Sequence, residues 1–298
     1  MTTSITTQGN LTQSPVPTTK GKGRGRRGNA NAQLLIGAVL VAIVVLLALV
    51  SFVWTPGDAY GTAAQDRLLH PNAEHLFGTD RFGRDVLSQI MIGARTTLLV
   101  GIVSVAIAVL LGVPFGIMAG MKPGATDTVV MGAGDIILAF PGLLLAIIFG
   151  ASFGASTWTA IIALGIGAAP AFARVARSGA MQVMRQDYIQ AARGANRSEF
   201  SIAVKHVLPN ISGMLVVQAS VNFAIAVLAE AGLSFLGLGT MPPTPSWGRM
   251  LQESQQFLGT HEYLAICPGI AIAIVVLGFN LLGDGLRDHF DPKTKGRS

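Results

Sequence analysis

The sequence predicts an all-α polytopic membrane protein with six transmembrane helices. Of its 298 residues, 51% are hydrophobic and only 12% are charged, whereas a soluble domain usually carries about 25% charged residues. The mean hydropathy is +0.55. Long uncharged runs also recur along the chain, and a helix needs about 20 apolar residues to cross the hydrocarbon core of a bilayer. Lipid is therefore expected to surround much of the chain.

The beginning of the chain differs from the rest. Residues 1–32 are rich in Thr, Ser, Gln, Pro and Gly and end in a basic cluster. Such a segment cannot bury a core, so we expect a disordered cytoplasmic tail. The uncharged run that follows is longer than the apolar region of a signal peptide, which spans roughly 7–15 residues. The prediction is therefore a true first transmembrane helix over residues 33–54.

Four further apolar regions supply the other five helices. The uncharged run over residues 136–173 is too long for one helix, and the Gly-rich stretch 150–156 divides it in two. The helical core is expected over residues 95–290. Its predicted transmembrane helices cover residues 96–121, 129–149, 157–175, 211–238 and 263–283.

The placement of Lys and Arg predicts the orientation. If the N-terminus lies inside, so do the loop near 121–128, the loop 176–209 and the C-terminal tail 291–298. With Arg174 counted in the loop 176–209 and Arg287 in the C-terminal segment, all but five of the 21 Lys and Arg residues then lie inside, in agreement with the positive-inside rule. Residues 55–94 become an extracytoplasmic segment, and 176–209 forms one or two short helices along the cytoplasmic surface. The five remaining cations are Arg67, Arg81, Arg84, Arg95 and Arg249.

Motifs for covalent chemistry are missing from the sequence. It has no G-x-x-x-x-G-K-[ST] phosphate loop, no H-E-x-x-H and only one cysteine, Cys267. His70 and His75 flank Glu74, but two histidines in a loop make a weak metal site. The net charge of +6 follows from membrane topology and gives no reason to expect nucleic acid. We therefore expect a chain that moves a solute, with no catalytic residue, metal or cofactor of its own.

Two carboxylates lie within the apolar runs. Glu230 falls inside the predicted helix 211–238, and a carboxylate in a spanning helix is costly unless it faces a cavity or a partner. It is either a residue of a translocation path or gate, or a residue that pairs with a polar neighbour and shapes packing. Asp135 is nearer the inside end of its helix, where we expect it to reach water.

Three stretches carry a resemblance to a known family. They are HLFGTDRFGRDVLSQIMIGARTTLLVG at 75–101, DYIQAARGANRSEFSIAVKHVLPN at 187–210, and a third that runs from AEAGLSFLGLG at 229–239 through PPTPSWGRML at 242–251 to PGIAIAIVVLGFNLLGDGLRDHFDPK at 268–293. In this order they resemble the integral membrane permeases of binding-protein-dependent ABC importers, specifically the C-type subunit of dipeptide and oligopeptide importers. The resemblance covers about residues 70–295.

This resemblance implies a type I ABC importer permease fold with a cytoplasmic coupling helix. The chain would form half of a translocation pore for dipeptides or short oligopeptides in the bacterial plasma (inner) membrane. Its partners would be a homologous B-type permease in a heterodimer, two cytoplasmic ATPase subunits, an extracytoplasmic peptide-binding protein and membrane lipid. ATP and Mg would be bound by the ATPase subunits, and this chain would be a non-catalytic subunit of the complex.

The second stretch is similar to the loop that docks on the ATPase in this family. Where the family favours Glu-Ala-Ala, this chain has Gln190-Ala191-Ala192, and the glycine expected four residues after the second alanine falls on Asn196. The local turn geometry is therefore expected to differ. The resemblance assigns docking to Gln190, Ala191, Ala192, Arg193, Gly194, Asn196 and Arg197.

Other functions remain open from the sequence. The basic loop 176–209 could instead bind anionic lipid head groups. Within the family, nickel or glutathione importers have similar permeases. Outside it, a secondary transporter should show inverted repeats and broken mid-membrane helices, and a membrane enzyme should show a polar catalytic pair; the sequence displays neither pattern.

Overall fold

A computed structural model describes residues 23–290, and their secondary structure is helical apart from one isolated bridge between Thr79 and Asp85. The expected tails at 1–22 and 291–298 lie outside the described residues. In chain order the α-helices are α1 Gly23–Ser51, α2 Val86–Met121, α3 Ala125–Leu138, α4 Gly142–Phe153, α5 Thr157–Met184, α6 Asp187–Gly194, α7 Glu199–Ile202, α8 Leu208–Phe235, α9 Trp247–Ser254 and α10 Tyr263–Phe290.

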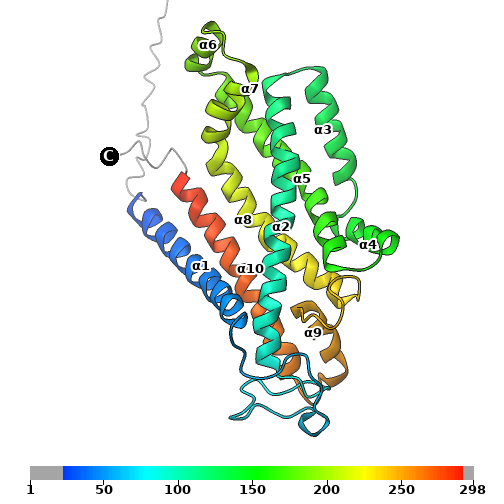
Figure 1. Ribbon diagram of the computed structural model, residues 1–298. Coiled ribbons are helices and arrows are strands. Elements are labelled where there is room, and N and C mark those ends of the chain that lie inside the picture. The colour runs from blue at the N-terminus through cyan, green and yellow to red at the C-terminus, as the bar shows by residue number, and fades with distance from the viewer. Residues whose placement is uncertain (1–22, 291–298) are drawn as a thin grey trace, which may run out of the picture.

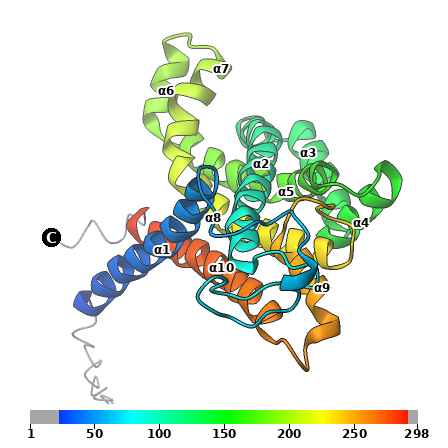
Figure 2. The ribbon, with the colours of Figure 1, turned by 60° about the horizontal axis from the view of Figure 1, so that its bottom comes forward.

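The long helices form one bundle with two distinct ends (Figure 1). We call the end that carries α6 and α7 the docking-loop end, and the end that carries α9 and the irregular segment 52–85 the outer-loop end. The start of α1 and the end of α10 lie on the docking-loop side. Viewed from the outer-loop end, α3 and α4 lie on the side of the bundle away from α1 (Figure 2).

Five single helices in the described chain are long and apolar enough to cross a membrane, and α3 with α4 makes a sixth span if the two are counted together. The predicted single helix over 129–149 is wrong in this respect, because α3 and α4 meet at an angle of 78°. The cause is Pro141, which has an extended backbone (ψ 129°), lacks an N–H and disfavours a helical conformation for the residue before it.

Several helices extend beyond the predicted boundaries; α10, for example, continues to Phe290, past residue 283. Helix α1 begins at Gly23, inside the segment predicted to be a disordered tail. Helix α5 continues to Met184, well past residue 175. Helix α2 begins at Val86 and not at the predicted residue 96. The Asp85 side chain accepts a hydrogen bond from the Ser88 N–H and so caps the start of α2. Hydropathy placed this start too late, since Arg95 interrupts the apolar run without ending the helix.

The closest helix pair is α2 with α5, which lie side by side along the centre of the bundle (Figure 1). Gly112, Gly116 and Gly120 form a row along α2, one turn apart, and face Ala169, Ala173 and Ala180 of α5. A Cβ at Gly116 would collide with the carbonyl oxygen of Ala173. Small residues at such an interface let two backbones approach closely, which is how helices associate in lipid.

The first helix is held against the bundle by glycines and by one arginine. Gly37 of α1 meets the backbone of Leu282, and Gly285 of α10 meets the backbone of Leu34. At the other end of α1, the Arg95 Nε donates a 2.6 Å hydrogen bond to the Ser51 hydroxyl, and the guanidinium lies 4.0 Å over the Phe52 ring. Arg95 thereby fastens the end of α1 to α2 by its charge as well as by packing.

The glycine row predicts the effect of adding a single methyl group. Gly116→Ala should lower the free energy of unfolding by about 1–3 kcal/mol, because overpacking forces a backbone shift. Gly132→Ala on α3 is the matched control, since a Cβ there meets nothing within 4 Å. Thermal unfolding of the purified protein in detergent measures both. Equal melting temperatures for Gly116→Ala and the unmodified protein would contradict the close α2–α5 approach.

Candidate functional site

The docking-loop end is built around α6, which three apolar side chains hold on the bundle. Ile189 of α6, Ile202 of α7 and Val207 are fully buried in a cluster with side chains from α2, α5 and α8. The Asn210 side chain also donates a 2.7 Å hydrogen bond to the carbonyl of His206, and the Tyr188 ring lies beside the His206 ring. This short helix is therefore rigidly attached rather than suspended on a free loop.

The turn between α6 and α7 is a Schellman motif centred on Asn196. The Asn196 N–H donates to the carbonyl of Arg193 over 2.9 Å, and the Arg197 N–H donates to the carbonyl of Ala192 over 3.2 Å. Asn196 has a φ of 56°, in the left-handed region that asparagine tolerates better than most residues. Asparagine thus supplies the turn for which a glycine was expected, and Gly194 is an ordinary helical residue.

The predicted docking residues are brought together on α6 and its C-terminal turn, but they differ in exposure. Gln190 and Ala191 are exposed, whereas Ala192 is half-buried and packs against the apolar cluster. Arg193 forms a 3.2 Å ion pair with Glu199. Arg197 is exposed, and no ion pair joins it to another described residue. Gln190, Ala191 and Arg197 are therefore the members most available to a partner.

Sequence reasoning missed Phe200, which is the most prominent apolar side chain at this end. It lies in α7 and is 79% exposed. Tyr188 and Val204 are also partly exposed nearby in the sequence, at 45% and 46%. A large aromatic side chain in water is typical of an anchor for another protein. The sequence signals only where α7 starts, through the capping residue Ser198, whose hydroxyl accepts from the Ser201 N–H, and not that Phe200 turns outward.

A π-helical segment, Ala203–Val207, joins α7 to α8. The Leu208 N–H donates to the carbonyl of Ala203, which is five residues back. Glu199–Phe235 therefore forms one continuous helical rod that starts in the docking loop and crosses the bundle. Single π turns inside α-helices are frequent at functional sites.

Glu230 lies near the other end of this rod, and its side chain is buried. It is 1% exposed, and its Oε1 accepts hydrogen bonds from the Ser234 hydroxyl (2.6 Å) and the Thr240 hydroxyl (3.1 Å). The Thr240 hydroxyl also accepts from Thr157 of α5. Within this chain the carboxylate faces no opening; it ties the turn after α8 back onto α8 and α5.

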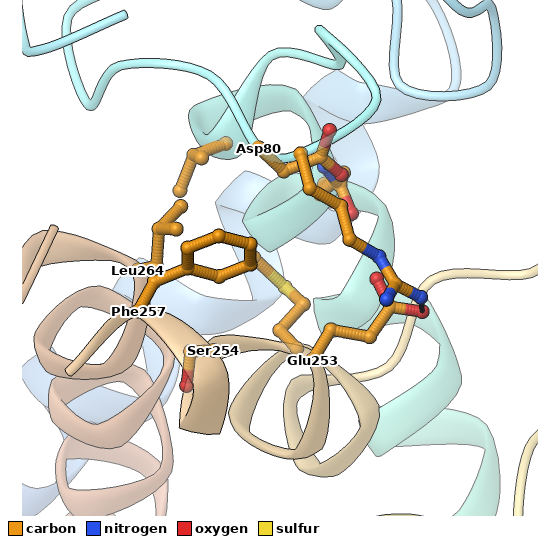
Figure 3. A pocket seen from close by; sticks show the side chains of 9 residues that line it. Asp80, Glu253, Ser254, Phe257 and Leu264 are labelled. Atoms are coloured by element: carbon orange, nitrogen blue, oxygen red, sulfur yellow. Dashed lines mark hydrogen bonds and ion pairs between the residues drawn. The ribbon is translucent and has the colours of Figure 1, made fainter. Parts of the chain in front are cut away.

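The outer-loop end contains a network of ion pairs centred on Glu253 of α9. Asp80 pairs with Arg84 (2.6 Å), and Arg84 reaches Glu253 (2.9 Å), as does Arg249 (2.9 Å). Arg84 therefore pairs within its own turn and also binds a residue of α9 that is 169 positions away in sequence. Figure 3 shows the pocket beside this network, with Asp80 and Glu253 at its polar edge and Phe257 and Leu264 on its apolar side.

The two histidines of the predicted weak metal site contact different partners. His75 Nδ1 is 3.0 Å from the Asp85 carboxylate, where it supports the cap of α2. The His70 ring instead stacks near His261, with centroids 4.9 Å apart. No group of three or more His, Cys, Asp or Glu residues within 23–290 has the arrangement of a metal site.

Comparison with known proteins identifies relatives along nearly the whole chain. Residues 112–296 match the family model described as the binding-protein-dependent transport system inner membrane component. The dipeptide transport system permease protein DppC of Alkalihalophilus pseudofirmus is 40% identical over 261 residues, 88% of this chain and 86% of that protein. The glutathione transport system permease protein GsiD of Pectobacterium atrosepticum is 39% identical over 87% of each chain.

The fold also matches a solved structure. The methionine ABC transporter MetNI in an inward-facing conformation superposes with a TM-score of 0.57, covering 68% of this chain and 97% of that chain at 20% identity. At this identity the likeness concerns the fold, which is that of a type I permease.

The Schellman turn predicts opposite effects for two neighbouring substitutions. Asn196→Ala should destabilise the docking loop by about 1–2 kcal/mol, because a left-handed backbone is costly for residues other than Gly and Asn. Gly194→Ala should stabilise α6 by about 0.5–1 kcal/mol, since Gly194 is helical and a Cβ there meets nothing. Hydrogen exchange of the α6 amides measures both, and the reverse order would show that Gly194 makes the turn.

The sealed carboxylate predicts how Glu230 variants unfold. Glu230→Ala should cost about 1–3 kcal/mol, because two buried hydroxyls lose their acceptor. Glu230→Gln keeps an acceptor oxygen and should cost less, and Glu262→Ala, at an exposed position, should cost little. Thermal unfolding compares the three. Equal stability of Glu230→Ala and Glu262→Ala would show that this hydroxyl network does not stabilise the fold.

Proposed function

We propose, from the premise that the chain belongs to the family of binding-protein-dependent transport system inner membrane components, that it forms half of the pore of an ATP-driven importer for dipeptides or short oligopeptides. Its relatives carry the names of dipeptide, peptide and glutathione permeases. The observation that carries the mechanism is the continuous rod Glu199–Phe235, which joins a protruding, rigidly packed docking loop to the interior of the bundle.

The partners follow from this assignment. A homologous permease would complete the pore, two ATPase subunits would bind ATP and Mg and sit against α6 and α7, and an extracytoplasmic binding protein would deliver cargo at the outer-loop end. The docking-loop end would then be cytoplasmic, together with both ends of the chain. This orientation agrees with the excess of Lys and Arg in the loops of that side.

Coupling would pass from the ATPase through two routes. Ile189 links α6 to the apolar cluster between α2 and α5, and the π segment links α7 to α8. Closure of the ATPase pair would therefore move α6 and α7 together and open the pore to the outside. ATP hydrolysis would return the pore to its inward-facing state. Glu230 would act as part of a gate by holding the turn after α8 in place, not as a lining residue.

Glutathione is the second candidate cargo, because GsiD relatives match nearly as well as the dipeptide permease. Both cargoes are short peptides with free charged termini, so the same kind of pore would serve either. Uptake assays with the assembled importer in proteoliposomes should show ATP-dependent entry of a radiolabelled dipeptide or of glutathione. Entry that persists without ATP would overturn the importer assignment in favour of a secondary transporter.

The docking claim predicts a loss of ATPase binding from two single substitutions. Phe200→Ala and Ala191→Arg should each reduce co-purification of the ATPase subunits and uptake by about tenfold or more, because an interface anchor typically contributes at least 2 kcal/mol. Ala191 is a cleaner site than Ala192, which packs inward. Tyr60→Ala, an exposed aromatic at the outer-loop end, is the matched control for ATPase binding. Retained ATPase binding and uptake in both variants would exclude this loop as the coupling element.

A further inference from the structure

Two ion pairs join α3 to α5, and they are built differently. Asp127 and Arg177 form a two-point pair in which Arg177 Nε and Nη2 each contact a different carboxylate oxygen. Asp135 and Arg174 share a single contact, 2.5 Å between Arg174 Nη2 and Asp135 Oδ1. The second carboxylate oxygen and the remaining guanidinium N–H groups of this pair stay available to another molecule.

The two pairs also differ in exposure. The side chains of Asp135 and Arg174 are 63% and 54% exposed, whereas those of Asp127 and Arg177 are 20% and 32% exposed. Asp135 lies ten residues into α3, and Arg174 lies ten residues before the end of α5. Both residues therefore lie within helices that are long and apolar enough to contribute to membrane spans.

An ion pair with both side chains more than half exposed is costly where a spanning helix faces lipid. The α3–α4 break lies directly beside it, and Figure 1 shows α3 ending partway along α2. Broken helices occur at membrane depth where they are covered by protein or line a water-filled cavity. The open pair and the break therefore lie on the same face of the chain, which is covered by protein or lines a polar space.

The chemistry of this face suits a small zwitterion. The last carbonyls of α3 form the negative end of the helix dipole and lie one turn beyond Asp135, so a cationic group is favoured there. Arg174 offers N–H donors in the planar arrangement that matches a carboxylate. Space is available as well, since a Cβ at Gly132, on the same face of α3 as Asp135, would meet nothing within 4 Å.

We propose that Asp135 and Arg174 bind the terminal ammonium and the terminal carboxylate of a short peptide as it passes through the pore. This inference rests on the proposed function. The peptide replaces one internal contact by two external ones, so both side chains keep a partner of opposite charge throughout. The pair closes again when the peptide leaves, and no unpaired charge remains within the spanning helices.

Charge exchange tests this role. Asp135→Asn and Arg174→Gln should each reduce dipeptide uptake by the assembled importer about tenfold or more, because each removes a charge-assisted hydrogen bond to the cargo. The double variant D135R/R174D should restore thermal stability and assembly but not uptake, since the negative end of the α3 dipole still favours a cationic group beside position 135. The matched control D127R/R177D, at the closed pair, should restore both.

Two outcomes would overturn the proposal. If D135R/R174D restores uptake as well as stability, the pair only fastens α3 to α5. If Asp135→Asn abolishes co-purification of the partner permease, the pair belongs to the subunit interface instead.

Water access is measured separately and does not depend on the cargo. Gly132→Cys in a Cys267→Ala chain should react with a membrane-impermeant thiol reagent in the assembled importer, and Ile270→Cys, an exposed apolar position in α10, should not. Unreactive Gly132→Cys overturns the aqueous path whatever the cargo is. A reactive cysteine together with no peptide uptake by the unmodified importer refutes the proposed function and this binding role, while the aqueous path stands.

Discussion

The close approach of α2 and α5 is the contact on which the rest of the bundle depends. The glycine row at 112, 116 and 120 brings the two backbones together, and the apolar cluster that forms between them receives Ile189 from α6 and Ile211 from α8. Water supplies no driving force between helices in lipid, so such close packing takes over the role of a hydrophobic core. The docking loop is rigid because it rests on this pair.

Most charged groups inside the bundle and at its outer-loop end are held by a fixed partner. Arg95 satisfies the last turn of α1 and stacks on Phe52, Glu230 is enclosed by hydroxyls, and the outer-loop charges pair around Glu253. Each of these groups has exchanged water for a fixed partner. Asp135 and Arg174 differ from these groups because more than half of each side chain stays exposed beside its partner, and the proposed binding role rests on that open side.

The sequence predicted the helices well where an apolar run alone decides the outcome. It failed where one residue overrides the run, as at Pro141, which bends the span, and at Asp85, which caps α2 before its apolar stretch begins. The docking residues were predicted by resemblance, but their exposure was not predictable. That Arg193 pairs with Glu199, that Ala192 turns inward and that Phe200 turns outward depends on how α6 and α7 pack.

The π segment between α7 and α8 also sets the rotational phase of the docking loop. A π turn holds one residue more than the α-helical turn it replaces, and one residue corresponds to about 100° of rotation around a helix axis. The face of α7 that carries Phe200 is therefore turned by that angle relative to a regular continuation of α8. The angle at which the chain presents itself to a partner is thus encoded in five residues, 203–207, that need not touch that partner.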